Sequence, residues 1–102
     1  MEFLVQFELE IPDGVLESEV QDREKAEAAA AETLAGQGHL VRLWRTSAGH
    51  GPTGALGLYR AGSKAELDVL LAALPLHEWM RISITPLDHH PNDPVRTPVM
   101  PR

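Results

Sequence analysis

The sequence predicts an α+β fold whose elements follow the order β-α-β-β-α-β. Three observations support this prediction: a strictly alternating strand opens the chain, two helix-prone segments each follow a β-rich run, and a glycine-rich loop separates two β-rich runs between those helices. The 102 residues fit one ordinary domain of about 100 to 150 residues. A single core and no second domain are therefore expected.

The first strand covers residues 3–11, where apolar side chains alternate with mostly polar ones. This period of two indicates a half-buried strand, with these side chains on the core face: Phe3, Val5, Phe7, Leu9 and Ile11. The segment Pro12-Asp13-Gly14 breaks the strand, because proline removes a backbone donor and Asp-Gly favours a turn. A long helix follows from about Leu16 to Ala35, and Gly36 and Gly38 supply its stop signals. Its apolar stripe is thin: Leu16, Val20, Ala28, Ala31 and Leu34.

A β-hairpin with a wide loop is expected next. Residues 39–45 and 55–60 are rich in β-formers and too short for typical helices, and the glycine-rich stretch 47–54 lies between them. Ser63 and Glu66 have the spacing of a capping box, in which each side chain satisfies a free backbone donor of the other at a helix start. Leucines form the buried stripe of that helix: Leu67, Leu70, Leu71 and Leu74.

The last predicted strand follows Pro75, which ends the second helix, and covers residues 79–87. Its apolar face holds Met80, Ile82 and Ile84. Residues 89–102 contain four of the eight prolines and no periodic pattern. We therefore expect one domain at 1–88 and an irregular, proline-rich tail at 89–102.

This element order is that of the ferredoxin-like split βαβ fold, a four-stranded antiparallel sheet with two helices on one face. Two helices cannot cover the other face of the sheet. On the first strand that face carries Leu4, Gln6 and Glu8. Such a mixture suits either solvent or a polar pocket closed by a second subunit, and by fold analogy small chains of this topology often pair sheet to sheet.

Composition excludes several classes of protein. The chain has no cysteine, which excludes disulfides, thiolate catalysis and cysteine-ligated zinc. Fifteen acidic and nine basic residues give a net charge of -6, which repels nucleic acid and anionic lipid. No apolar run approaches the roughly 20 residues that span a bilayer, and Glu2 opens the chain rather than a basic segment. A cytoplasmic protein with no nucleic-acid or membrane partner is expected.

Two stretches of the chain resemble the muconolactone delta-isomerase family. The first is Gly38-His-Leu-Val-Arg-Leu-Trp-Arg45, which matches the family's glycine followed by a strand that ends in Leu-Trp-Arg. The second is Leu74-Pro-Leu-His-Glu-Trp-Met80, continued by the strand after it and by His90-Pro91. The order and spacing of these motifs agree with the family from residue 1 to about residue 93.

The resemblance implies ferredoxin-like subunits that pair into a dimeric α+β barrel, which in the isomerases stacks into a ring-shaped decamer. It implies a reaction that moves a carbon-carbon double bond within a five-membered lactone bearing a carboxymethyl group, during bacterial breakdown of aromatic compounds. No metal or organic cofactor is implied. The expected partners are therefore a small acidic ring compound and further copies of the chain.

Such a proton shift beside a carbonyl group needs three kinds of side chain. A carboxylate or imidazole must remove a proton from an activated carbon and return it two carbons away. A hydrogen-bond donor must stabilise the negative charge that grows on the lactone oxygen. A guanidinium should hold the substrate carboxylate, because the paired donors of arginine match it better than lysine does.

Glu27 is the first candidate for the proton-transfer carboxylate. The resemblance assigns it this role, because it aligns with an acidic residue of the family when the chain is counted back from Leu-Trp-Arg. Glu24, three residues earlier, is the reserve candidate. In the alternative interpretation, all four acidic residues of this region form a solvated helix face: Asp22, Glu24, Glu27 and Glu32.

Arg45, Arg42 and Trp44 are the candidates for substrate binding. An odd separation places the two arginines on opposite faces of a strand, so only one can line a given pocket. Arg42 should share a face with Leu40 and Trp44, and Arg45 closes the family motif, which favours Arg45. A surface or interface salt bridge remains the alternative for either arginine, and a core or interface position for Trp44.

Two histidines are candidate accessory groups in catalysis. His90 matches the His-Pro of the family, where it either closes over a neighbouring subunit's pocket or anchors the tail. His50 resembles a histidine in the loop after Leu-Trp-Arg, although a glycine-rich loop equally suits an exposed residue. No metal site is expected from the histidines, because they lack helical metal-ligand spacing and a nearby acidic set.

The chain also departs from the family pattern. Gly51 replaces a tyrosine of the characterised isomerases, Leu4 and Gln6 replace polar or basic residues, and the loop is about two residues longer. A differently shaped and less basic pocket is expected. Two alternative functions therefore stay open, a small-molecule-binding dimeric barrel without catalysis and a cofactor-independent monooxygenase.

Overall fold

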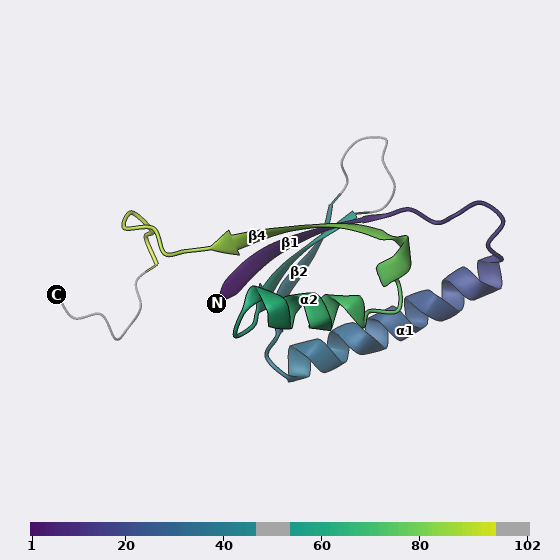
Figure 1. The fold of residues 1–102 in the computed structure, drawn as a ribbon, viewed down its shortest axis with the longest axis horizontal. Coiled ribbons are helices and arrows are strands. Elements are labelled where there is room, and N and C mark those ends of the chain that lie inside the picture. Colours follow the sequence, from purple (N-terminus) through teal and green to yellow (C-terminus); the bar gives the residue numbers. More distant parts are fainter. Residues whose placement is uncertain (47–53, 96–102) are drawn as a thin grey trace.

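The computed structural model describes residues 1–46 and 54–95 and has the predicted order of elements. Four strands form one sheet in the order β2-β3-β1-β4, and every neighbouring pair is antiparallel. Both long helices lie on the same side of this sheet (Figure 1). The predicted ferredoxin-like α+β fold is confirmed. Its elements are β1 (Glu2–Leu9), α1 (Glu17–Gly36), β2 (Leu40–Thr46), β3 (Gly54–Arg60), α2 (Lys64–Ala72), the 3-10 helix η1 (His77–Trp79) and β4 (Met80–Leu87).

The core lies between the sheet and the two helices, as the alternation in β1 predicts. Phe3 and Val5 are fully buried on the helix-facing side, and they pair with Tyr59 and Gly57 of β3. Leu67 of α2 is fully buried against them. Of the side chains of α1, only Leu34 is buried in the core, whereas the shorter α2 buries Leu67 and Leu71. The thin stripe of α1 therefore buries fewer apolar side chains for its length than α2 does.

Gly38 ends α1 as the sequence predicts, whereas the predicted capping box at the start of α2 forms only in part. Gly38 adopts a left-handed backbone with φ of 83°, which most side chains avoid. This turn lets the amide of His39 donate to the carbonyl of Leu34 at 2.9 Å. At the start of α2, Ser63 Oγ accepts from the amide of Glu66 at 3.1 Å, whereas the Glu66 carboxylate accepts from the amide of Gly62 at 2.6 Å rather than from Ser63.

Several strand boundaries differ from the prediction, most of them by one residue. β1 ends at Leu9 rather than Ile11, because Leu9 pairs with Met80, the first residue of β4. The fourth strand does not begin at Trp79, whose amide donates to the carbonyl of Leu76 at 2.9 Å and so belongs to η1. The buried ring of Trp79 lies against the guanidinium of Arg23 in α1.

A β-bulge in β2 changes which residues share a face. Leu40 pairs with Tyr59 and Arg42 pairs with the adjacent Leu58, so Val41 is an extra residue in the ladder. The expectation that Leu40 shares a face with Arg42 is therefore wrong. Leu40 faces the helices, whereas Arg42 lies on the open face of the sheet.

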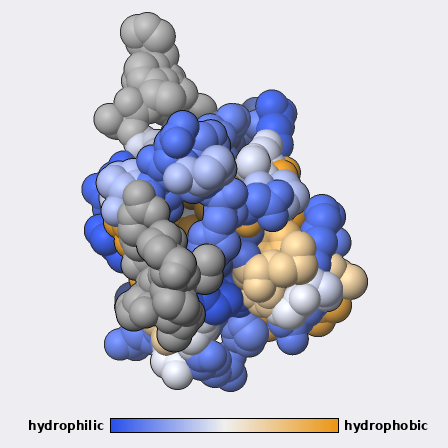
Figure 2. Space-filling model, turned by 90° about the vertical axis from the view of Figure 1, so that its left-hand side faces the viewer, coloured by the Kyte–Doolittle hydropathy of each residue, from blue (hydrophilic) through white to orange (hydrophobic). Residues whose placement is uncertain are grey.

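Residues 88–95 follow β4 without a helix or strand. They lie at the same end of the molecule as the N-terminus (Figure 1). The surface at this end is mostly hydrophilic with small hydrophobic areas (Figure 2), as expected for a chain with a net charge of -6. The predicted division between residues 88 and 89 stays a prediction.

Arg23 fastens α1 to the segment that precedes β4. Its Nη1 donates to the carbonyl of Pro75 at 3.3 Å, its guanidinium lies 4.2 Å from the centre of the Trp79 ring, and it also pairs with Glu78. A cation–π contact and a hydrogen bond to a backbone carbonyl each contribute on the order of 1 kcal/mol to the free energy of unfolding.

We expect Arg23→Gln to lower the free energy of unfolding by about 1 to 2 kcal/mol, because these contacts would be lost together. Urea denaturation would measure this change. Lys64→Gln is the matched control, since it removes only an exposed pair with Asp68 and should change stability by less than about 0.5 kcal/mol. Equal effects of the two substitutions would contradict the contribution of Arg23.

Candidate active site

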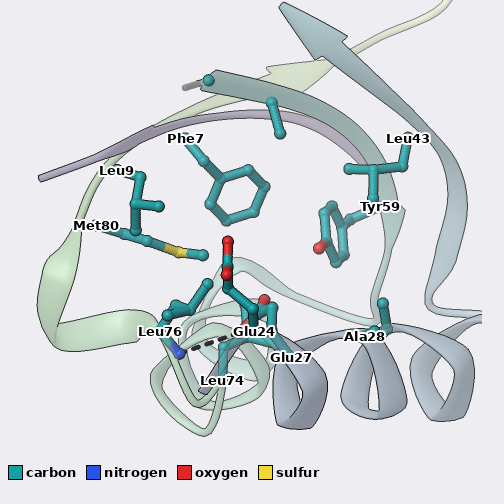
Figure 3. Close-up of a pocket in the computed structure, with 13 residues that line it drawn as sticks. Phe7, Leu9, Glu24, Glu27, Ala28, Leu43, Tyr59, Leu74, Leu76 and Met80 are labelled. Atoms are coloured by element: carbon teal, nitrogen blue, oxygen red, sulfur yellow. Dashed lines mark hydrogen bonds between the residues drawn. The ribbon is translucent and has the colours of Figure 1, made fainter. Parts of the chain in front are cut away.

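A cavity of about 310 Å³ lies between the helix-facing side of the sheet and the middle of α1. Its walls are almost entirely apolar, and two carboxylates and one phenol are the polar side chains among the described lining residues. The close-up shows the sheet above and α1 below this space (Figure 3). The lining residues are Phe7, Leu9, Glu24, Glu27, Ala28, Ala31, Leu43, Gly54, Ala55, Tyr59, Leu74, Leu76 and Met80.

Small side chains on both walls explain why a space remains here. Ala28 and Ala31 face the cavity from α1, and Ala55 faces it from β3. Larger side chains at these three positions would fill a space of this size, because protein interiors otherwise pack to high density. The cavity is thus a direct product of the alanine-rich stripe of α1 and of Ala55 in β3.

Glu27 extends into this cavity from α1 (Figure 3). Its Oε1 accepts a hydrogen bond from the amide of Leu76 at 3.0 Å, which fixes the side chain in place. Burial raises the pKa of Glu27, and the hydrogen bond from Leu76 opposes this rise. A positioned carboxylate in apolar surroundings is a stronger base than an exposed one, which suits it to proton transfer.

Tyr59 enters the cavity from β3 (Figure 3) and is the single tyrosine of the chain. Only 3% of its surface is exposed. Burial, and secondly the charge of Glu27, raise the pKa of Tyr59 to about 12. The phenol is therefore protonated at neutral pH and has a hydrogen to donate to a ligand.

Gly57 determines how the Tyr59 ring lies. A Cβ atom on Gly57 would stand 2.6 Å from Cε1 and 3.2 Å from Cδ1 of Tyr59, so the ring lies directly over this glycine. The ring also packs against Phe7 with 6.1 Å between centroids and a tilt of 59°. The ring thus leans along β3 toward Ala55, which lines the cavity.

The structure brings Glu24 and Glu27 to this cavity and places the predicted substrate-binding residues outside its lining. Arg45 lies on the cavity-facing side of the sheet, where it pairs with Ala55, but its side chain is exposed. Arg42 and Trp44 lie on the open face, where the guanidinium is 4.9 Å from the centre of the indole ring. Their roles in binding stay predictions.

Of the two candidate histidines, the structure describes His90, which does not line the cavity. His90 is exposed after β4, and its Nδ1 accepts from the amide of Asn92 at 2.9 Å. His50 lies outside the described residues. Their roles in catalysis likewise stay predictions.

Sequence reasoning assigned no role to Tyr59 or Gly57. The strand alternation did contain this information, because it places Tyr59 and Gly57 of β3 opposite the buried Phe3 and Val5 of β1. Pairing the predicted strands in register would therefore have put the single tyrosine on the cavity side of the sheet.

No group of three or more His, Asp or Glu side chains within residues 1–46 and 54–95 is arranged to hold a metal ion. In the same part of the chain, no helix has the length and apolar character needed to cross a bilayer.

The family model for muconolactone delta-isomerase matches residues 1–93. A muconolactone delta-isomerase of Cupriavidus pinatubonensis is 32% identical over 92 residues, which cover 90% of this chain and 97% of that protein. Muconolactone delta-isomerase 1 of Acinetobacter lwoffii is 36% identical over 93 residues, which cover 90% of this chain and 93% of that protein.

Solved structures agree with these sequence matches. The crystal structure of a muconolactone isomerase superposes with a TM-score of 0.80 at 25% identity, over 95% of this chain and 98% of that one. A 5-chloro-2-hydroxyhydroquinone dehydrochlorinase from Burkholderia phenoliruptrix has a TM-score of 0.64 at 21% identity, over 88% of this chain and 96% of that one, and shares the fold alone. The match of the family model over residues 1–93 and the identities above 30% identify this chain as a member of the muconolactone delta-isomerase family.

Proposed function

We propose that this chain is a cofactor-independent isomerase that shifts a carbon-carbon double bond by proton transfer in muconolactone or a related acidic lactone of aromatic catabolism. The observation that carries the proposal is the Glu27 carboxylate, held by the Leu76 amide inside an apolar cavity large enough for a five-membered ring. Family membership supports the reaction class.

In this reaction Glu27 removes a proton from the ring carbon that is bonded to the ring oxygen of the lactone. The electrons of the broken C–H bond move through the double bond to the carbonyl oxygen. The same carboxyl group then returns the proton to the carbon beside the carbonyl, so the double bond has moved and no proton is gained or lost. The apolar walls exclude water, which would otherwise exchange with the transferred proton.

Arg45 is the proposed partner of the substrate carboxylate, because it lies on the cavity-facing side of β2 beside Ala55. Its side chain is exposed and unpaired with any described carboxylate, so it is free to swing toward an acidic ligand at the cavity mouth. His50 and His90 are proposed as accessory groups.

An ultraviolet assay with muconolactone tests this function. The purified protein should change the absorbance of the lactone at a rate proportional to protein concentration, without added metal or cofactor. Loss of the signal on heat denaturation is the control. Absence of turnover by a folded protein, as judged by circular dichroism, would overturn the proposal.

We also propose that two copies of the chain pair through the open face of the sheet. Apolar side chains gather there, with Leu4, Leu56 and Leu58 half-buried and Trp44 40% exposed. Arg42 and Trp44 are then interface residues. Light scattering should give a mass about twice the 11.2 kDa of one chain, or about ten times that mass if dimers form a ring.

A charge in the middle of this face should separate the subunits. Leu58 lies between Leu4 and Arg42 on neighbouring strands. We expect Leu58→Lys to reduce the particle mass toward that of one chain, because an ammonium group buried beside the like charge of Arg42 is costly. Val69→Lys is the matched control, since Val69 is 70% exposed on α2 and its substitution should leave the mass unchanged. An unchanged mass for a folded Leu58→Lys variant would contradict pairing through this face.

A further inference from the structure

The proposed reaction needs a donor for the charge that develops on the carbonyl oxygen of the lactone, and one suitable side chain lies among the described residues that line the cavity. Among the described lining residues, Tyr59 alone carries a side-chain hydrogen-bond donor. The other polar side chains there, Glu24 and Glu27, are carboxylates that accept hydrogen bonds when ionised.

The position of Tyr59 suits this role. Its ring lies over Gly57 and against Phe7, so packing on two sides limits its motion. Within the described part of the chain its hydroxyl makes no hydrogen bond with another residue, although Tyr59 is only 3% exposed. The donor is therefore held in place and available to a ligand in the cavity.

Glu27 and Tyr59 reach the cavity from opposite walls, one from α1 and the other from β3 (Figure 3). When a flat lactone ring lies between them, the Glu27 carboxylate faces a C–H bond of the ring and the Tyr59 hydroxyl lies next to the carbonyl oxygen. This is the arrangement that enolisation requires, a base at the carbon and a donor at the oxygen.

We propose that the Tyr59 hydroxyl donates a hydrogen bond to the ring carbonyl oxygen of the lactone and stabilises the dienolate formed when Glu27 removes the proton. This assignment rests on the proposed function. Tyr59 keeps its own proton throughout, and the proton taken by Glu27 is the one returned to carbon. No oxidant, reductant or co-reactant takes part.

The charge state of the phenol agrees with this role. Burial and the charge of Glu27 raise the pKa of Tyr59 to about 12, so the hydroxyl keeps its proton at working pH. When Glu27 accepts a proton, its negative charge disappears and no longer raises the pKa of Tyr59. The phenol then becomes a better donor at the step in which the oxygen becomes negative.

Tyr59→Phe tests the assignment, because it removes one oxygen atom and keeps the ring that packs against Phe7 and Gly57. We expect kcat with muconolactone to fall about a hundredfold with little change in KM, since the hydrogen bond strengthens only as charge develops. Thr33→Val is the matched control, because it removes an exposed hydroxyl of α1 that donates to the carbonyl of Ala29. A kcat within about threefold of the unsubstituted protein would overturn the assignment and leave the proposed isomerase function intact.

A second readout does not depend on turnover. Since Tyr59 is the single tyrosine, its ring carbon bearing the hydroxyl gives one NMR signal in protein labelled with 13C-tyrosine. Tetronate, the stable enolate of a five-membered lactone, mimics the dienolate. We expect tetronate to shift this signal, and we expect Tyr59→Phe to weaken tetronate binding about tenfold or more, the scale of a hydrogen bond to a charged group.

These two measurements separate the two proposals. If the unsubstituted protein does not convert muconolactone, the proposed function fails, and the tetronate experiment alone decides the role of Tyr59. A shifted tyrosine signal together with weaker binding by Tyr59→Phe would support donation to an enolate oxygen. An unshifted signal, or equal tetronate binding by both proteins, would overturn it.

Discussion

Glu27→Gln is expected to lower the kcat for muconolactone by about a hundredfold or more, the scale typical of losing a general base. The amide has nearly the shape of the carboxylate and its oxygen can still accept from the Leu76 amide, so folding and particle mass should be retained. It cannot take up the substrate proton. Steady-state kinetics beside circular dichroism and light scattering would measure both effects.

Two further substitutions of α1 control this experiment. Glu32→Gln removes an exposed carboxylate from the same helix and should leave kcat unchanged. Glu24→Gln tests the reserve candidate, because Glu24 also lines the cavity although it is exposed. Unchanged turnover by Glu27→Gln would remove Glu27 from the mechanism, and a large loss in Glu24→Gln instead would transfer the role to Glu24.

The pH dependence should identify the same group. Burial raises the pKa of Glu27, so kcat/KM should rise with pH through that raised pKa and level off above it, where the base is ionised. Stability should change in the opposite direction. Because the folded chain binds this proton more tightly than the unfolded chain, the contribution of Glu27 to stability falls as pH rises from its ordinary pKa through the raised one. Glu27→Gln should abolish both trends.

Gly57→Ala is expected to reduce both stability and turnover. The added methyl group would lie 2.6 Å from Cε1 of Tyr59, so the ring must move. Such overpacking costs about 1 to 3 kcal/mol. A displacement of the phenol by about 1 Å should also lower kcat by about tenfold to a hundredfold, because catalysis depends on the position of the donor. Urea denaturation and steady-state kinetics would measure the two losses separately.

A double-substitution cycle distinguishes positioning from general destabilisation. In protein that already carries Tyr59→Phe, Gly57→Ala should still lower stability, since the ring remains, but it should not lower kcat further. Gly36→Ala is the control, because a methyl group there meets no atom within 4 Å and should change stability by less than about 1 kcal/mol. If Gly57→Ala lowers kcat equally with and without the phenol oxygen, Gly57 does not position that oxygen.

The fold was predictable because its signals are local. The alternation from Phe3 to Phe7 identifies a strand, the left-handed Gly38 marks a helix end, and Ser63 marks a helix start. Each depends on residues within one strand or one turn. Element order and fold class followed from these signals without knowledge of any distant contact.

The site was only partly predictable because its geometry depends on distant contacts. Glu27 lies 49 residues from Leu76, whose amide holds it, and no helical pattern distinguishes it from its acidic neighbours. The bulge at Val41 moves Leu40 to the helix-facing side, and no residue type in β2 predicts this bulge. Candidates chosen by family motif therefore included Arg42 and Trp44, which the structure places on the other face of the sheet from the cavity.

The loose seating of α1 has a consequence for how a ring compound enters. Arg23 holds α1 near its first turns and Leu34 holds its last turns, whereas beside the cavity the helix is held by the hydrogen bond from the Leu76 amide to Glu27. Local opening of such a segment costs less free energy than separating paired strands. Outward movement of this part of α1 would therefore leave the sheet intact but release Glu27 from Leu76, which would couple the entry of a ring compound to the positioning of the base.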